Sequence, residues 1–303
     1  MAVTAAMVKE LREMTGAGMM DCKKALSNTD GDMDKAVEYL RENGMAKAAK
    51  KAGRIAAEGI VKVVTEGNKA AIVEVNSETD FVAKNADFNA YVEEVAQQAL
   101  NTKATDIDAF LAESWTKDTS KTVADVLAGQ VAIIGENLKI RRFAQVEESN
   151  GFIASYIHMG GKIGVLVDVE TDVVNSAIEE MAKNVAMQAA ALKPMYTNRS
   201  EVDTEYIAKE TEIITATAKN EKPDANDKII EGMVKGRLNK ELKEICLLDQ
   251  TYVKAEDGKQ SVSAYVAEVA KANNANITIK GFVRFETGEG IEKKNEDFAA
   301  EVA

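Results

Sequence analysis

The chain has only two cysteines, Cys22 and Cys246, which lie far apart and form no CxxC pair. A disulfide framework and a zinc site are therefore not expected, and both thiols are predicted to be reduced and structural. His158 is the single histidine, and it falls on a strand that leads into a Gly-Gly turn. A structural or surface role is more usual there than that of a catalytic base. We expect no catalytic residue, no bound metal and no cofactor.

Basic residues are also fewer than acidic ones: the chain has 38 Lys and Arg and 50 Asp and Glu, so its net charge is −12. A general nucleic-acid binder needs a basic face, so a protein partner fits this charge better. No apolar run approaches the length of a membrane span, and Lys9 and Glu10 interrupt the start of the chain before any signal-peptide core. The composition predicts a cytoplasmic protein with no direct contact to nucleic acid or membrane.

The N-terminal region shows the spacing of three short helices. Apolar residues at helical spacing predict the first over Thr4 to Met14 and the second over Met19 to Leu26. Asp32 is placed to N-cap a third helix, which Gly44 ends as its C′ residue. In Ala46 to Arg54, basic residues stand among alanines, which favours a solvated helical linker over a binding patch.

An internal repeat organises the rest of the chain. Gly59 to Asp80 and Gly151 to Asp172 align without gaps, since 151 − 59 and 172 − 80 both equal 92. Each window predicts a β-hairpin, and the second turns through Gly160-Gly161. A second aligned pair of windows, from Thr122 and from Ser261, predicts a helix and then a third strand in each copy. We therefore predict an α+β fold in which an antiparallel sheet covered by helices occurs twice.

The second copy carries an insertion. The offset between the copies rises from 92 to 139, which places 47 additional residues between Asp172 and Ser261. Both prolines of the chain, Pro194 and Pro223, fall in this insertion. Apolar residues near heptad spacing predict a projecting helical hairpin over about residues 195–238. Such a hairpin has too little apolar surface to stand alone, so it is a candidate surface for homodimer formation.

A phenylalanine directly follows an aspartate in S-E-T-D-F-V-A-K-N (residues 77–85), where the first hairpin ends. The aligned residue of the second copy is Val173, so the scaffold itself does not require an aromatic side chain there. Phe81 either packs under its own loop or is held out for a partner, and spacing alone does not decide between the two. Thr79 or Asp80 is placed to N-cap the helix that follows.

Two segments resemble the signature segments of the elongation factor Ts family, the guanine-nucleotide exchange factors of elongation factor Tu. They are G-A-G-M-M-D-C-K-K-A-L (Gly16 to Leu26) and V-N-S-E-T-D-F-V-A-K-N (Val75 to Asn85), and the resemblance extends over essentially the whole chain. The implied division is a ubiquitin-associated-like helical domain and linker over 1–54, a core N-subdomain over 55–147, a core C-subdomain with the helical hairpin over 148–287, and a C-terminal module with a helix over 288–303.

The resemblance implies a factor of protein biosynthesis, not an enzyme, that binds GDP-bound elongation factor Tu and promotes GDP release so that GTP can bind. The implied wedge is Asp80-Phe81, flanked by Thr79 and Val82, which enters the nucleotide-binding domain of Tu and disturbs its Mg²⁺ and phosphate site. Further implied contacts to Tu come from Arg12, Met19 and Met20 in the N-terminal domain, from His158 and Gly160 in the C-subdomain, and from the C-terminal tail.

Other interpretations stay open from the residues themselves. Met19 and Met20 are suited to an adaptable contact surface, but they fit the core of a small domain equally well. The whole protein fits a non-enzymatic adaptor that binds a helper protein through its helical N-terminal module, with the core as a dimer scaffold, although Phe81 then has no role. The third interpretation is an enzyme, which would require a cofactor site that the sequence does not show.

Overall fold

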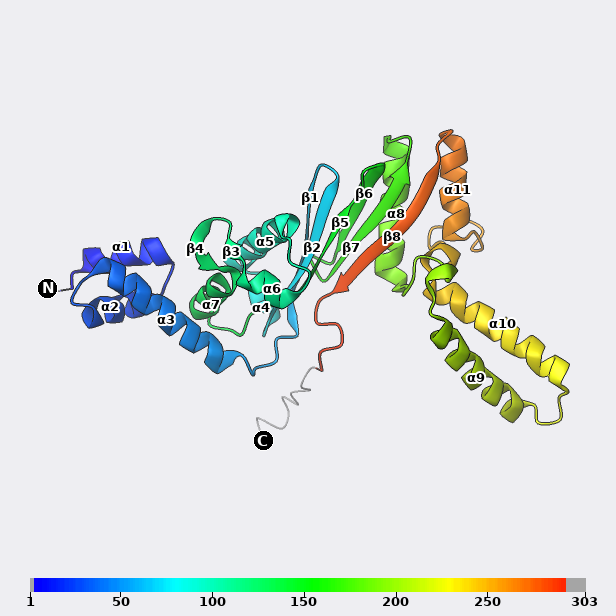
Figure 1. Ribbon diagram of the computed structural model, residues 1–303, viewed down its shortest axis with the longest axis horizontal. Coiled ribbons are helices and arrows are strands. Elements are labelled where there is room, and N and C mark those ends of the chain that lie inside the picture. The colour runs from blue at the N-terminus through cyan, green and yellow to red at the C-terminus, as the bar shows by residue number, and fades with distance from the viewer. Residues whose placement is uncertain (1–2, 293–303) are drawn as a thin grey trace.

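The computed structural model describes residues 3–292, in which an N-terminal group of helices precedes antiparallel sheets with their covering helices (Figure 1). The N-terminal group consists of α1 (Ala5–Thr15), α2 (Met19–Asn28) and α3 (Met33–Lys51). Its own small core contains Val8, Leu11, Cys22, Ala25, Leu26 and Ala36. The expected C-terminal helix and tail contact fall mainly in 293–303, outside the described residues.

The third helix is longer than predicted. We expected Gly44 to end it, but α3 continues to Lys51 and absorbs most of the expected linker. Gly44 is buried at the crossing of α3 with α7 (Val123–Ile134), and a Cβ at Gly44 would lie 3.7 Å from Ala132 Cβ. That distance is an ordinary van der Waals contact, so Gly44 is an interior residue of α3 at the helix crossing and is not a helix end. Because Arg41 also pairs with Asp125 at 2.6 Å, the N-terminal helices are docked on the core.

The first sheet has the strand order β1-β2-β5, and the predicted hairpin, N-capped helix and third strand are confirmed. Its region contains β1 (Glu58–Glu66), β2 (Lys69–Ser77), α4 (Asp80–Ala83), α5 (Ala86–Asn101), α6 (Ile107–Ala112), β3 (Ser114–Trp115), β4 (Asp118–Thr122), α7 and β5 (Lys139–Glu147). The short helix α6 and the two-stranded β3-β4 pair were not predicted.

The second sheet repeats this arrangement with the order β6-β7-β8. Its region contains β6 (Gly151–His158), β7 (Ile163–Thr171), α8 (Ser176–Leu192), α11 (Val262–Ala272) and β8 (Ile277–Glu286). Between α8 and α11 lie η1 (Arg199–Glu201), α9 (Thr204–Glu221), α10 (Asp227–Ile245) and η2 (Leu247–Asp249). Helices α9 and α10 form the predicted hairpin and project away from the sheets (Figure 1).

The two sheets pack face to face, with α5 and α8 on their outer faces. Strand β2 is buried on both of its faces, because Val73 and Val75 point to the helix side while Ile72 points to the other sheet. At Gly164 the sheets are so close that a Cβ would lie 2.5 Å from the Val61 side chain. The sequence predicted the two sheets, but not that they share an interface.

The ungapped alignment of the two copies is wrong in its details. Strands β1 and β6 keep the offset of 92, since 158 − 66 equals 92 at their ends. Strands β2 and β7 are offset by 94, since 171 − 77 equals 94, because the turn over 159–162 is two residues longer than Gly67-Asn68. At the N-caps of α5 and α8 the offset falls to 90, since 175 − 85 equals 90. The first copy therefore has four additional residues, 94 − 90, between strand and helix.

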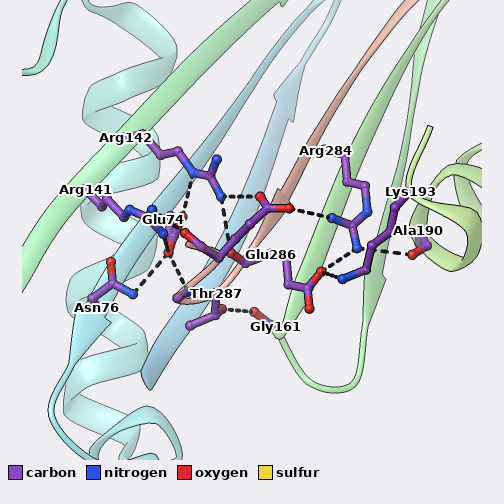
Figure 2. A network of polar contacts seen from close by, with 12 residues as sticks. Glu74, Asn76, Arg141, Arg142, Gly161, Ala190, Lys193, Arg284, Glu286 and Thr287 are labelled. Carbon is purple, nitrogen blue, oxygen red and sulfur yellow. Dashed lines mark hydrogen bonds and ion pairs between the residues drawn. The ribbon is translucent and has the colours of Figure 1, made fainter. Parts of the chain in front are cut away.

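A fully buried carboxylate, Glu74 on β2, lies at the edge of the interface between the sheets (Figure 2). It accepts hydrogen bonds from Arg141 Nη1 at 3.0 Å, from Arg142 Nε at 2.6 Å and from the Gly288 backbone N–H at 2.8 Å. The Arg142 guanidinium also lies 4.2 Å from the centre of the Phe285 ring. Residues of the first sheet thus bind the end of β8, at Phe285, and the segment that follows β8, at Gly288.

Both cysteines are buried and free, which is the placement expected of structural thiols. Burial raises the pKa of the Cys22 and Cys246 thiols, which lowers their reactivity. Within residues 3–292, none of the helices combines the length and the apolar content that crossing a bilayer needs.

Candidate functional site

The connection between β2 and α5 contains residues that the second copy lacks. Each connection begins at an acidic residue that accepts a hydrogen bond from an asparagine just before the third strand. Glu78 accepts the backbone N–H of Asn137 at 2.5 Å, and Asp172 accepts that of Asn276 at 2.8 Å. Both end at an asparagine, Asn85 or Asn175, that N-caps the covering helix. The anchors of the two connections are therefore equivalent, and only the number of residues between them differs.

The additional residues are Thr79 to Val82. Ala83 packs into the first core as Val173 packs into the second, so these two residues correspond. We expected Val173 to correspond to Phe81, and that assignment is wrong because a gapless alignment hides the insertion. Phe81 has no counterpart in the second copy.

This insertion forms the single turn of helix α4. Thr79, and not Asp80, is its N-cap, since Thr79 Oγ1 accepts the Val82 backbone N–H at 3.4 Å. Val82 packs toward the first core, whereas the Phe81 side chain is 80% exposed. The alternative in which Phe81 packs under its own loop is therefore excluded. The carboxylate of Asp80 accepts from Lys84 Nζ at 2.6 Å, and this hydrogen bond lowers the pKa of Asp80.

A carboxylate from another part of the chain fixes the backbone just before Phe81. Glu136, between α7 and β5, accepts the backbone N–H groups of Glu78 and Thr79 at Oε2, each at 3.0 Å. Its Oε1 accepts from Thr79 Oγ1 at 2.6 Å. Sequence analysis missed Glu136, although a signal existed, because Ala275 stands at the matching position of the second copy (275 − 136 equals the third-strand offset of 139).

The predicted N-terminal site residues lie on a different unit of the molecule, at the end of α1 and the start of α2. Arg12 is exposed, and Met19 and Met20 are 59% and 73% exposed. The alternative in which the two methionines form the core of the small domain is therefore wrong. The short turn over Gly16 to Gly18 places the start of α2 beside the end of α1, so the three side chains belong to one end of the helical group.

His158 and Gly160 lie in and beside the turn between β6 and β7. His158 is exposed, and its Nδ1 lies 2.9 Å from the Tyr156 hydroxyl. The turn is fastened to the first sheet, since Val61 donates its backbone N–H to the Gly161 carbonyl at 2.7 Å.

The same turn approaches the end of the first sheet from which the Phe81 connection leaves. Lys162 pairs with Glu58, which is opposite the last residue of β2, Ser77. Lys162 also contributes, after Lys84, to the lowered pKa of Asp80. The structure therefore brings the predicted sites of the two subdomains to one end of the first sheet. In the part of the chain described, no group of three or more His, Cys, Asp or Glu side chains is arranged to hold a metal ion.

Comparison with known proteins gives matches along nearly the whole chain. The family model described as Elongation factor TS matches residues 78–289, which include α4 and both third strands. The protein named elongation factor Ts of Clostridioides difficile (strain 630) is 56% identical over 303 residues, covering 99% of this chain and 98% of the relative. Proteins of the same name from Clostridium tetani (strain Massachusetts / E88) and Clostridium botulinum (strain Eklund 17B / Type B) are 52% and 51% identical, with the same coverage of both chains.

Proposed function

The chain belongs to the elongation factor Ts family, and on this premise we propose that it binds GDP-bound elongation factor Tu and promotes the release of GDP, so that GTP can bind. The family consists of exchange factors and not of enzymes, so the protein needs no reacting group of its own. If its binding weakens the affinity of Tu for GDP by some factor, GDP weakens its binding to Tu by the same factor. A ternary complex then forms and decays.

The exposed side chain of Phe81 is the observation that carries the proposal. A large aromatic side chain that is 80% exposed on a hydrogen-bonded loop is suited to anchor a protein interface. A loop that is already ordered loses little conformational entropy on binding. We propose that Asp80-Phe81 enters the nucleotide-binding domain of Tu and disturbs the site of Mg²⁺ and the phosphates, with Thr79 and Val82 supporting it.

The remaining contacts to Tu are divided among the other units in this proposal. The N-terminal domain, residues 1–54, contacts Tu through Arg12, Met19 and Met20, whose flexible thioether side chains adapt to a partner surface. The C-subdomain, residues 148–287, contacts Tu through His158 and Gly160. Because the turn that carries them is fastened to β1, this contact and the Phe81 contact of the N-subdomain, residues 55–147, are held in a fixed relation.

Self-association through the helical hairpin stays a prediction. Ile213 on α9 and Ile229 on α10 are 49% and 47% exposed, which leaves apolar surface on a hairpin that already buries Ala218 and Ile230. A second copy of the chain is the partner that we predict for this surface.

The first experiment mixes the purified protein with elongation factor Tu that carries a fluorescent GDP analogue, in the presence of excess unlabelled GDP. We expect the fluorescence to decay faster as the concentration of the protein rises. An unchanged release rate would contradict the proposal as a whole.

A second experiment tests the wedge itself by deleting Thr79 to Val82. The shortened connection has the length of its counterpart in the second copy, which bridges equivalent anchors, so the protein should still unfold cooperatively. We expect the acceleration of GDP release to fall at least tenfold, which corresponds to about 1.4 kcal/mol of activation free energy. A control replaces the same four residues with Gly-Ser-Gly-Ser, which keeps the length and removes Phe81. If either protein folds and accelerates release normally, the wedge mechanism is wrong.

A further inference from the structure

We propose that Glu136 is a positioning residue for nucleotide exchange. It holds the connection between β2 and α5 in the conformation that exposes the Phe81 side chain. This inference rests on the proposed function of Phe81 and assigns the residue on which that function depends. Glu136 does not bind Asp80 or Phe81 themselves, because its three hydrogen bonds go to Glu78 and Thr79, two residues and one residue before Asp80.

The first step of the argument is that the Glu136 carboxylate is itself fixed in place. It follows Gly135, which ends α7 in the left-handed region with φ of 88° and donates its N–H to the Val131 carbonyl. It precedes Asn137, whose side chain donates to the Arg54 carbonyl at 2.7 Å and whose backbone N–H donates to Glu78. The residues on both sides of Glu136 are thus hydrogen-bonded to separate parts of the chain.

The second step is that α4 cannot hold Phe81 in place by itself. The helix has four residues, and an isolated turn of this length is not stable in water. Its N-cap, Thr79, is the residue that Glu136 holds, through the backbone N–H and through the hydroxyl group. Hydrogen bonds to a charged acceptor are stronger than bonds between neutral groups. Packing of Val82 and Ala83 on the first core anchors the C-terminal side of the turn, and Glu136 anchors its N-terminal side, so the direction in which Phe81 points depends on Glu136.

The third step is the comparison with the second copy, which has no insertion and no equivalent carboxylate. There Ala275 replaces Glu136, and Asp172 closes the junction by accepting from the backbone and the side chain of Asn276 at 2.8 Å and 2.7 Å. A junction of this type consequently folds without a carboxylate at that position. Glu136 accompanies the four additional residues and is not a requirement of the scaffold.

The experiment measures the acceleration of GDP release from Tu for Glu136→Ala, Glu136→Gln, Phe81→Ala and the double variant Glu136→Ala/Phe81→Ala. Alanine is the residue of the second copy, so the fold should persist, and thermal melting checks this. Glutamine keeps an oxygen acceptor for both backbone N–H groups. We expect Glu136→Ala to lose about tenfold of the acceleration, Glu136→Gln to remain within about threefold of the parent protein, and the double variant to be no slower than Phe81→Ala.

A second readout is independent of Tu. In Glu136→Ala, hydrogen exchange at the backbone amides of Glu78 and Thr79 should become faster, while the amides of Val73 and Val75 within β2 should keep their protection. A role limited to general stability would instead affect all four amides together.

Different failures point to different errors. If Phe81→Ala is impaired and Glu136→Ala exchanges normally, the positioning role is wrong and the wedge stands. If the two single effects add in the double variant, Glu136 acts elsewhere and the inference is also wrong. If Phe81→Ala exchanges normally, the proposed wedge and the inference that rests on it both fail.

Discussion

Phe81 is a residue whose removal should separate folding from function. Deleting a buried aromatic side chain costs about 3–5 kcal/mol of unfolding free energy. Phe81 is 80% exposed, so we expect Phe81→Ala to change the unfolding free energy by no more than about 0.5 kcal/mol, a usual value for surface substitutions. The rate of GDP release from Tu should nevertheless fall at least tenfold, about 1.4 kcal/mol.

The matched control for this variant is Val174→Ala. Val174 is 54% exposed and lies in the equivalent connection of the second copy, where it corresponds to Lys84. It should change neither melting nor exchange. A Phe81→Ala protein that melts far below the parent but exchanges normally in its folded fraction would show that Phe81 is a packing residue only.

Asp168 on β7 is a residue whose charge should cost stability. Burial and the neighbouring Glu148 carboxylate raise the pKa of Asp168 to about 6, while Lys280 opposes part of this shift. Between pH 4 and pH 6 the folded protein therefore holds a proton at Asp168 that the unfolded chain has released. Stability must fall as the pH rises through this window, and the penalty is complete above pH 6.

Replacing Asp168 with Asn should remove that penalty. We expect the variant to be more stable than the parent at pH 7.5 by about 1 kcal/mol, since the side chain is only half-buried, and this difference to become smaller as the pH falls to 4.5. Urea denaturation between pH 4.5 and 7.5 measures this difference. The Asn150 N–H and Lys280 lower the pKa of Glu148. A constant difference at every pH would mean that the proton on Asp168 is not involved.

At the scale of elements, the helical hairpin should be separable from the sheets. Deleting Ile207 to Leu238 and joining the ends with a short Gly-Ser linker keeps Tyr206 and Glu241, whose side chains hydrogen-bond at 2.7 Å at the base of the hairpin. The only buried apolar side chains in the deleted segment are Ala218 and Ile230. We therefore expect the core to keep its cooperative unfolding.

Sedimentation velocity of the same deletion variant tests self-association. If the hairpin is the dimer surface, the variant should sediment as a monomer at concentrations where the full chain forms a larger species. Equal oligomeric states for the two proteins would contradict the dimer prediction. Loss of cooperative unfolding would show that the hairpin supports the sheets.

Sequence patterns identified the elements well and the relations between elements poorly. Alternating residues in both copies, and the Gly-Gly turn in the second, predicted the two hairpins, because these signals are local. Gly44 was misassigned, because a glycine that ends a helix and a glycine at a helix crossing look alike in a single sequence. Phe81 was singled out, but on a wrong alignment to Val173. Glu136 was missed because its partners Glu78 and Thr79 lie 58 and 57 residues away in the sequence.

At the scale of the whole molecule, the interface between the sheets contains two corresponding carboxylates. Glu74 and Asp168 match, since 168 − 74 equals the β2-to-β7 offset of 94, and each lies beside a bulge in its sheet. Glu74 meets the chain that leaves β8, at Gly288. Asp168 lies beside the Glu148 carboxylate, which belongs to the chain that leaves β5 and raises the pKa of Asp168. Each sheet thus receives the end of the other copy's third strand, an arrangement that no local pattern predicts.

The two corresponding sites differ in how their charge is compensated. Glu74 faces two arginines, at 3.0 Å and 2.6 Å (Figure 2). Arg142 also pairs with Glu289. Asp168 faces another carboxylate, and Lys280 pairs with that carboxylate at 3.0 Å. The same position in the fold should therefore be stabilising when charged in the first copy and destabilising when charged in the second.

Neutralising each carboxylate should then change stability in opposite directions. Glu74→Gln leaves the guanidinium groups of Arg141 and Arg142 without a full counter-charge, and breaking a buried ion pair on one side costs about 3–5 kcal/mol. We expect the unfolding free energy to fall by about 3 kcal/mol. The loss stays at the lower end of this range because the two arginine side chains are 23% and 30% exposed, so water solvates part of their charge. Urea denaturation at pH 7.5 should show Glu74→Gln well below the parent protein and Asp168→Asn above it. If both variants change the unfolding free energy in the same direction, charge does not distinguish the two sites. Apolar contacts then hold the second sheet to the first, where Leu166 and Phe285 pack against Val61 and Ile72.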